Sequence, residues 1–172
     1  MSSEAKKIIP VHTEESIFQI IQECELSIQE EKIVADYVQS RSCNFISTPF
    51  SIKAVKRVAS LGVPFLKIGS GEFNNFPLIA EACKTGLPLL LSTGMNDLKS
   101  IDKTVQLIKG FGNDFALMHC TNIYPTPNKN VRLNAISEMR DRYKDIIIGL
   151  SDHTFTNHAC FGAMAMGASI IE

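Results

Sequence analysis

The sequence has almost no net charge and no run of basic residues. Seventeen Lys and Arg residues oppose 18 Asp and Glu residues, which leaves a formal net charge of −1 over 172 residues. Proteins that bind nucleic acid or anionic membranes by charge carry a clustered basic patch. The composition therefore points to neither nucleic acid nor a membrane, and we expect small-molecule or protein partners.

Paired cysteines and long apolar runs are also missing. Five scattered cysteines form no Cys-x-x-Cys pair, and an odd number does not fit a disulfide framework. The first residues lack the apolar core of a signal peptide, and the longest apolar run, 159–171, is short and interrupted by glycine. We therefore expect a cytoplasmic protein.

The residues that are present predict one globular domain built from alternating strands and helices. Hydrophobic residues make up 45% of the chain and charged residues 20%, and no domain boundary is evident. Short apolar segments predict strands at 44–48, 64–69, 87–91, 115–120, 146–150 and 168–171. Amphipathic segments predict helices at 15–24, 27–41, 51–61, 78–84, 97–109, 135–143 and 157–166. Ser27 and Glu30 match a capping box, and Pro77 fits a first helical position.

This alternation favours a parallel sheet with helices outside it. An open doubly wound sheet and an eight-stranded (β/α) barrel both fit. Against the open sheet, the sequence has no Gly-x-Gly-x-x-Gly turn, and polar residues follow every strand instead of one switch point. Against the barrel, the chain is short, since a complete barrel takes about 250 residues.

Polar side chains follow the predicted strands where each strand ends. In a barrel these ends meet at one mouth, where active sites are built. The residues concerned are Thr48, Lys67, Ser70, Glu72, Ser92, Thr93, His119, Asn122, Tyr124, Ser151, Asp152 and His153.

Lys67 is the most informative of these residues. Strand alternation places it on the same face as Phe65, inside the barrel, where an ammonium group is unfavourable unless an anion or carboxylate meets it. It could bind a phosphate or carboxylate, or form a Schiff base, and the sequence does not separate these roles. The alternative is an edge-strand lysine whose ammonium reaches water.

The other candidates each have an ordinary structural alternative. The loops 69–71 and 92–94 offer hydroxyls and close backbone amides to an anion, or are plain turns. Glu72 is a candidate acid/base or a solvated carboxylate, and His153 is a metal ligand, an acid/base or neither. We expect His119 in the core, and His12 and His158 on the surface.

Five ordered segments resemble motifs of the sialic acid synthase family, namely 45–50, 67–72, 91–95, 119–127 and 148–154. Members of this family condense phosphoenolpyruvate with N-acetylmannosamine. The resemblance implies a TIM barrel, and the family adds a small antifreeze-like domain. Over 1–172 we expect a single incomplete barrel domain with about six of eight strand-helix units and no antifreeze-like domain.

The resemblance also implies roles for individual residues. Glu72 and Lys67 would be catalytic, Tyr124 would contact the sugar, and His153 would bind Mn²⁺ or Mg²⁺, which would polarise the aldehyde of the open-chain sugar. The full-length protein would be a homodimer. The implied phosphoenolpyruvate-binding residues are Thr48, Lys67, Ser70, Ser92, Asn122 and Ser151.

Three alternatives stay open at this point. One is a synthase of a related nonulosonic acid, legionaminic or pseudaminic acid, although the segment 122–124 favours the sialic acid branch. Another is an aldolase that forms a Schiff base through Lys67. The third is an inactive fragment that serves as a structural or interaction module.

Overall fold

The computed structural model describes residues 3–10 and 13–172, so His12 lies outside the described residues. The chain divides into two compact units, 1–43 and 44–172, which we describe separately. The expectation of a single domain stays a prediction. The first unit contains the 3-10 helix η1 (Ala5–Lys7) and the helices α1 (Ile17–Glu23) and α2 (Ile28–Ser40).

Both helices of the first unit begin at capping boxes. The Ser27 side chain accepts from the Glu30 amide, and the Glu30 carboxylate accepts from the Ser27 amide, as the sequence predicts. Ser16 and Gln19 make the same reciprocal bonds at the start of α1. Each box satisfies two of the amides that a helix start leaves without partners.

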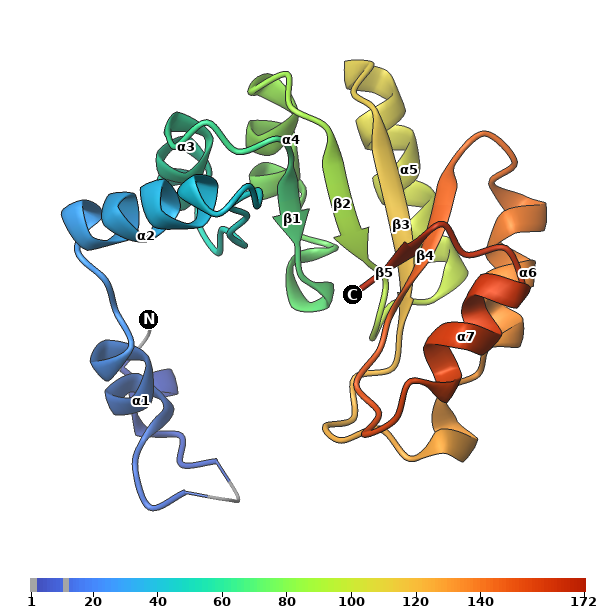
Figure 1. The fold of residues 1–172 in the computed structure, drawn as a ribbon, viewed down its shortest axis with the longest axis horizontal. Coiled ribbons are helices and arrows are strands. Elements are labelled where there is room, and N and C mark those ends of the chain that lie inside the picture. Colours follow the sequence, from blue (N-terminus) through green and yellow to red (C-terminus); the bar gives the residue numbers. More distant parts are fainter. Residues whose placement is uncertain (1–2, 11–12) are drawn as a thin grey trace. The chain divides into compact units, whose positions relative to one another are not determined.

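The second unit contains the sheet and its helices (Figure 1). Its strands are β1 (Leu66–Ile68), β2 (Leu89–Ser92), β3 (Phe115–Cys120), β4 (Ile147–Ser151) and β5 (Ile170–Ile171). Its helices are α3 (Ile52–Ser60), α4 (Phe76–Lys84), α5 (Leu98–Phe111), α6 (Asn134–Arg142) and α7 (His158–Ala165), with short 3-10 turns η2 (Ser70–Glu72) and η3 (Asn128–Asn130). A helix thus separates each strand from the next.

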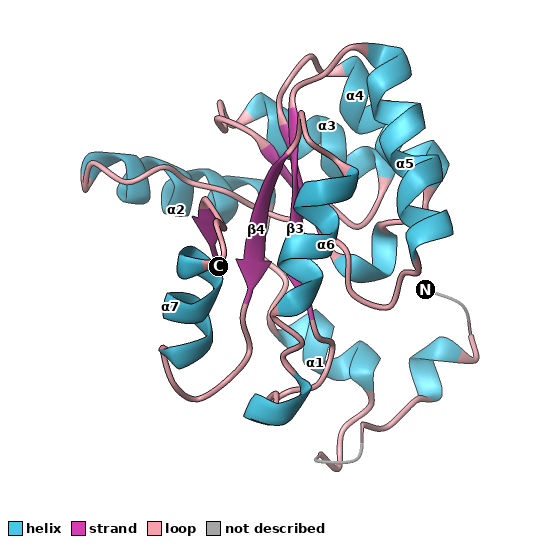
Figure 2. Cartoon of the chain, turned by 90° about the vertical axis from the view of Figure 1, so that its right-hand side faces the viewer, coloured by secondary structure: helices cyan, strands magenta, loops and turns pink. Residues whose placement is uncertain are grey.

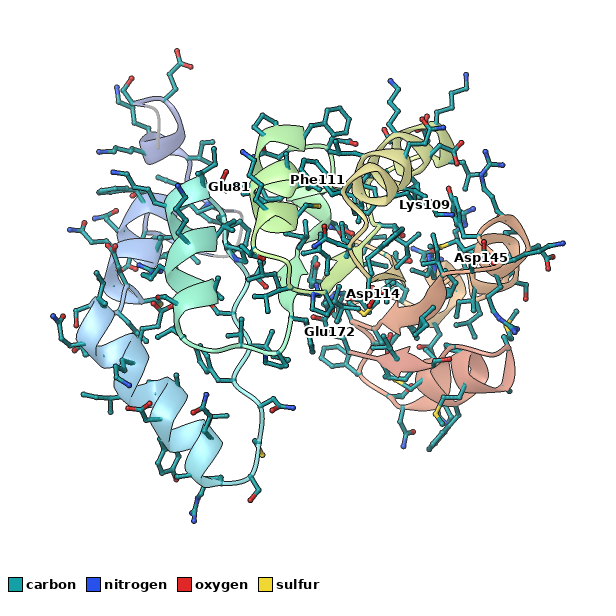
Figure 3. All side chains as sticks on the ribbon, turned by 90° about the horizontal axis from the view of Figure 1, so that it is seen from above. Glu81, Lys109, Phe111, Asp114, Asp145 and Glu172 are labelled. Atoms are coloured by element: carbon teal, nitrogen blue, oxygen red, sulfur yellow. The ribbon has the colours of Figure 1, made fainter. Side chains whose placement is uncertain are left out.

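The sheet confirms the predicted fold class. Its strands lie in the order β1-β2-β3-β4-β5, and every neighbouring pair is parallel. Helices α3 to α7 follow one another in an arc outside the strands (Figure 3). Consecutive parallel strands with helices on one side are the arrangement of part of a TIM barrel.

One predicted strand is wrong. Residues 44–48 belong to no strand, so the sheet has five strands where the sequence predicts six. The segment still runs beside the start of the loop after β1, because Thr48 Cγ2 lies 3.8 Å from where a Cβ on Gly69 would stand. A strand is defined by its ladder of backbone hydrogen bonds, which an apolar pattern ending in Pro49 does not guarantee.

The two faces of the sheet differ in character. The register places Ile68, Leu91 and Leu117 on the outer face, where they join the hydrophobic core beneath the helices. Lys67 and Leu90 are paired on the opposite, inner face. Because side chains alternate along a strand, the outer face supplies packing while the inner face is free to carry polar groups.

His119 lies on the helix-covered side of β3 and confirms the expectation of a core histidine. It is 8% exposed, and its Nε2 donates to the backbone oxygen of Val131 at 2.6 Å, whereas His158 is exposed as expected. Burial lowers the pKa of His119, with Arg132 acting in the same direction, while the bond to Val131 and the nearby Glu138 oppose the shift.

This lowered pKa predicts acid sensitivity. As the pH falls below 6.5, His119 becomes protonated in the unfolded chain, while it stays neutral in the folded chain because its pKa there is lower. Protonation therefore favours the unfolded chain, and the free energy of unfolding falls as the pH falls. Between pH 7.5 and 5.5 we expect His119 to account for a loss of up to about 1.4 kcal/mol. Urea unfolding at both pH values should show this loss in the wild type and a smaller one in His119→Gln, which keeps a donor for Val131. Equal pH dependence in the two proteins would contradict the prediction.

Candidate active site

The ends of the strands bring the candidate residues to one edge of the sheet. Neighbouring strands run in the same direction, as β1 and β2 show in Figure 1 and β3 and β4 in Figure 2. The loops after β1, β2, β3 and β4 therefore leave the sheet at the same edge. This is the position where a TIM barrel carries its active site.

Lys67 points to the inner side, as the sequence predicts, and meets a hydroxyl and a carboxylate. Its residue is 8% exposed, its Nζ donates to Ser92 Oγ at 2.9 Å, and the Oε1 of Glu172 lies 3.2 Å away. Glu172 itself is about half-exposed and lies on the inner side of the strands (Figure 3). The buried ammonium is thus paired, and the predicted anionic partner is Glu172.

A cavity of about 340 Å³ opens beside this pair. Thr48, Lys67 and Glu172 line its polar part, and Leu90 and Ile170 line its apolar part. Thr48 therefore lies near Lys67 although the segment that carries it is not a strand. A space of this size, with a few polar groups in an apolar wall, suits a small anionic molecule.

Gly94 is the point where the loops after β1, β2 and β3 meet. A Cβ on Gly94 would overlap Asn122 Oδ1 and would lie 2.8 Å from Ser70 Oγ. The Cys120 thiol donates to Asn122 Oδ1 at 3.3 Å and helps to hold that amide. Ser70 and Asn122, which are far apart in sequence, thus converge at a backbone position where no side chain fits.

Ser151, His153 and Tyr124 form a second group at the same edge. Ser151 Oγ lies 3.4 Å from His153 Nε2, and the rings of His153 and Tyr124 have centroids 4.2 Å apart with a tilt of 53°. The Thr126 amide donates to the His153 backbone oxygen at 2.8 Å and joins the two loops. Burial, followed by the charges of Cys120 and Glu172, raises the pKa of Tyr124, so it remains a neutral hydroxyl at neutral pH.

Glu72 is held apart from these contacts. Its Oε2 accepts from Asn75 Nδ2 at 2.6 Å, while Asn75 Oδ1 caps the start of α4 by accepting from the Leu78 amide. Among the described residues this is the one hydrogen bond of the Glu72 carboxylate, and it does not join Glu72 to Lys67. The acid/base role of Glu72 stays a prediction.

In the part of the chain that the structure describes, no group of metal-ligating side chains includes the predicted metal ligand, His153. Within residues 3–10 and 13–172, no group of three or more His, Cys, Asp and Glu side chains could hold a metal ion. Mn²⁺ and Mg²⁺ are held by several ligands, mainly oxygens, in octahedral geometry. Among the described side chains around His153 there is a single imidazole, and the metal-ligand role of His153 stays a prediction.

Sequence reasoning missed three residues of this site. Glu172 pairs with Lys67 across most of the chain's length, which no local pattern reveals. Asn75 holds the Glu72 carboxylate by a side-chain hydrogen bond, and Asn96 joins the loops after β1 and β2. The signal that could have found Asn75 is its place before Phe76 and Pro77, since asparagine is a common helix cap.

Comparison with known proteins places the chain in a family. The NeuB family model matches residues 2–172. The chain belongs to the NeuB family. An uncharacterized protein of Methanocaldococcus jannaschii is 36% identical to it over 177 residues, covering 99% of this chain and 52% of that protein.

Two further proteins that are similar to this chain have named activities. An N-acetylneuraminate-9-phosphate synthase of Drosophila melanogaster is 38% identical, over 75% of this chain and 35% of that protein. An N,N'-diacetyllegionaminic acid synthase of Campylobacter jejuni is 33% identical, over 100% of this chain and 53% of that protein. The chain thus spans about half the length, or less, of the curated relatives it matches.

Solved structures agree with the NeuB assignment. An N-acetylneuraminic acid synthetase of Leptospira borgpetersenii, solved with citrate, matches with a TM-score of 0.86 at 30% identity over 90% of this chain and 54% of that one. A truncated 3-deoxy-D-arabino-heptulosonate 7-phosphate synthase of Thermotoga maritima matches with a TM-score of 0.71 at 20% identity, which shows a shared fold alone. None of the described helices is long and apolar enough to cross a membrane.

Lys67 is a buried cation, and dehydration of its ammonium group opposes folding. We therefore predict that the folded state of this NeuB chain does not need the residue for stability. Methionine fills a similar volume without a charge to dehydrate, and the half-exposed Glu172 can turn to water. We expect Lys67→Met to leave the free energy of unfolding within about 1 kcal/mol of wild type or to raise it.

Urea unfolding measures this difference, with Lys84→Met as the matched control. Lys84 pairs with Glu81 on α4, and its side chain is 63% exposed. A loss of about 3 kcal/mol or more in Lys67→Met would show that the lysine is a structural residue.

Proposed function

We propose that this chain carries the phosphoenolpyruvate site of a synthase that condenses phosphoenolpyruvate with N-acetylmannosamine. The observation that carries the proposal is the buried Lys67 ammonium with Ser92 and Glu172, at the sheet edge where Ser70 and Asn122 converge. Membership of the NeuB family supports it, because relatives include named sialic acid and legionaminic acid synthases.

The donors of this group suit a phosphate ester. Lys67 contributes a point charge, and Ser70, Ser92 and Ser151 contribute hydroxyls at or just beyond the ends of β1, β2 and β4. The carboxylate of Glu172 lies against the Lys67 ammonium and marks where an anionic group fits. A phosphoenolpyruvate carboxylate or phosphate would take that place, while Glu172 turns toward solvent.

The reaction needs a new carbon–carbon bond and the loss of phosphate. The methylene carbon of phosphoenolpyruvate attacks the aldehyde carbon of the open-chain sugar, and the aldehyde oxygen takes up a proton. Water then adds to the carbon that bears the phosphate and releases a proton, which balances the one taken up by the aldehyde oxygen. The tetrahedral intermediate expels hydrogen phosphate, which carries the hydroxyl proton, to leave a 2-keto acid. The cationic and hydroxyl groups around Lys67 hold the phosphate in both steps and stabilise its charge as it leaves.

Turnover of the 172-residue chain tests the proposal. We expect phosphate release from phosphoenolpyruvate and N-acetylmannosamine with Mn²⁺ present, reduced about 100-fold or more in Lys67→Met because the leaving phosphate loses its cation. Lys84→Met should match wild type, since Lys84 pairs with Glu81 at the surface.

A chain that releases no phosphate is examined by calorimetric titration with phosphoenolpyruvate. Binding by wild type and by Lys84→Met, lost in Lys67→Met, would support the proposal for the binding site. No binding by the folded wild type would contradict it and would favour the structural module.

A related nonulosonic acid synthase is the second candidate, because legionaminic acid synthases are among the relatives. We propose N-acetylmannosamine as the sugar, with Tyr124 as its contact. Tyr124 is 63% exposed and its ring contacts that of His153 at a tilt, so its hydroxyl is available to a ligand at the rim of the site.

Competition between sugars separates the two candidates. We expect N-acetylmannosamine to support faster phosphate release than 2,4-diacetamido-2,4,6-trideoxymannose by about 10-fold or more, and Tyr124→Phe to reduce this preference by removing a hydrogen-bonding hydroxyl. Where turnover is absent, binding of each sugar beside saturating phosphoenolpyruvate gives the same comparison. Preference for the diacetamido sugar would contradict the assignment.

A further inference from the structure

Asn96 joins two loops of the candidate site through its side-chain amide. Its Nδ2 donates to the backbone oxygen of Ser70 at 3.2 Å and to that of Gly94 at 2.6 Å. One amide group therefore holds the loop after β1 and the loop after β2 at the same point. No motif or family match gives Asn96 a role.

A second asparagine orients this amide. Asn74 Nδ2 donates to Asn96 Oδ1 at 2.6 Å, which turns the Nδ2 group of Asn96 toward the two carbonyl oxygens. The Asn96 backbone amide also donates to the Thr93 oxygen at 3.3 Å. Side-chain and backbone bonds thus fix both ends of Asn96, as a rigid bridge between loops requires.

The bridge closes a turn whose backbone conformation is unfavourable. Met95, between Gly94 and Asn96, has a φ of 62°, in the left-handed region that side chains disfavour. Met95 is 72% exposed, so burial of its side chain does not stabilise this conformation. Asn96, on the C-terminal side of Met95, bonds to the Gly94 and Thr93 oxygens on its N-terminal side, which stabilises the turn.

We propose that Asn96 is a positioning residue for phosphoenolpyruvate. By holding the Ser70 and Gly94 carbonyls together, it keeps Ser70 Oγ beside Gly94 and Asn122, where the anion-binding groups converge. Loss of the bridge frees the two loops from each other and separates donors that must act on one ligand. This inference rests on the proposed function, which names the ligand.

The chain offers a matched control at the other edge of the sheet. Asn113 Nδ2 also donates to two backbone oxygens, those of Cys83 and Leu87, at 3.0 and 3.1 Å. It lies before β3, among the loops at the N-terminal ends of the strands. Asn113→Leu thus removes the same kind of bridge without touching the site.

Calorimetric titration with phosphoenolpyruvate is the first test, applied to wild type, Asn96→Leu and Asn113→Leu. Leucine keeps the shape of asparagine without its hydrogen bonds. We expect Asn96→Leu to raise the Kd about 10-fold or more, while Asn113→Leu binds as wild type does even where it unfolds at lower urea. Asn74→Leu should raise the Kd less, since it removes the orienting bond alone. Unchanged affinity in Asn96→Leu would overturn the proposal.

Amide hydrogen exchange without ligand is the second test. We expect exchange in segments 69–75 and 92–97 to accelerate about 10-fold in Asn96→Leu, and to stay as in wild type in Asn113→Leu. Unchanged exchange in both segments of Asn96→Leu would show that the amide is no bridge. If wild type binds no phosphoenolpyruvate, the proposed function fails, and the exchange result decides by itself whether Asn96 couples the loops.

Discussion

The parallel pairing of every neighbouring strand is the constraint on which the rest of this structure depends. Parallel strands end at the same edge, so residues as distant in sequence as Ser70 and Asn122 meet around Gly94. Parallel pairing also requires a long connection between strands, and helices α4 to α7 supply these connections on one side of the sheet. None of the helices described within 44–172 covers the opposite face, which can therefore hold a ligand.

This division gives the two faces different physical tasks. The outer face buries aliphatic side chains such as Ile68 and Leu117 in the hydrophobic core, and their burial favours folding. The inner face contains Lys67, whose dehydration opposes folding even with Ser92 and Glu172 as partners. Anion binding is the role that we propose for this buried cation in β1 of a NeuB family chain.

The sequence predicted those features that depend on neighbouring residues or on strand alternation. The capping box of Ser27 and Glu30 is local, and the inward direction of Lys67 follows from its place in an apolar run. The sequence also predicted a carboxylate or anion beside Lys67 but not Glu172, since their proximity depends on β1 and β5 closing toward each other. The strand at 44–48 was predicted wrongly because pairing depends on a neighbouring strand as well as on pattern. Asn96 was missed because its partners, Asn74 and the Ser70 carbonyl, approach it through the fold.

The exposure of Tyr124 has a consequence for how such a barrel diversifies. Tyr124 lies on a loop beyond the end of β3, 63% exposed, whereas Lys67 and Ser92 are buried within the sheet. Substitution at the rim changes what lies over the mouth of the site without altering the volume or rotamers of the core. On the proposed function, recognition of the sugar can therefore evolve at little risk to folding, while the groups proposed to hold phosphoenolpyruvate stay buried in the sheet. Synthases with the same sheet and different sugars are the expected result of that separation.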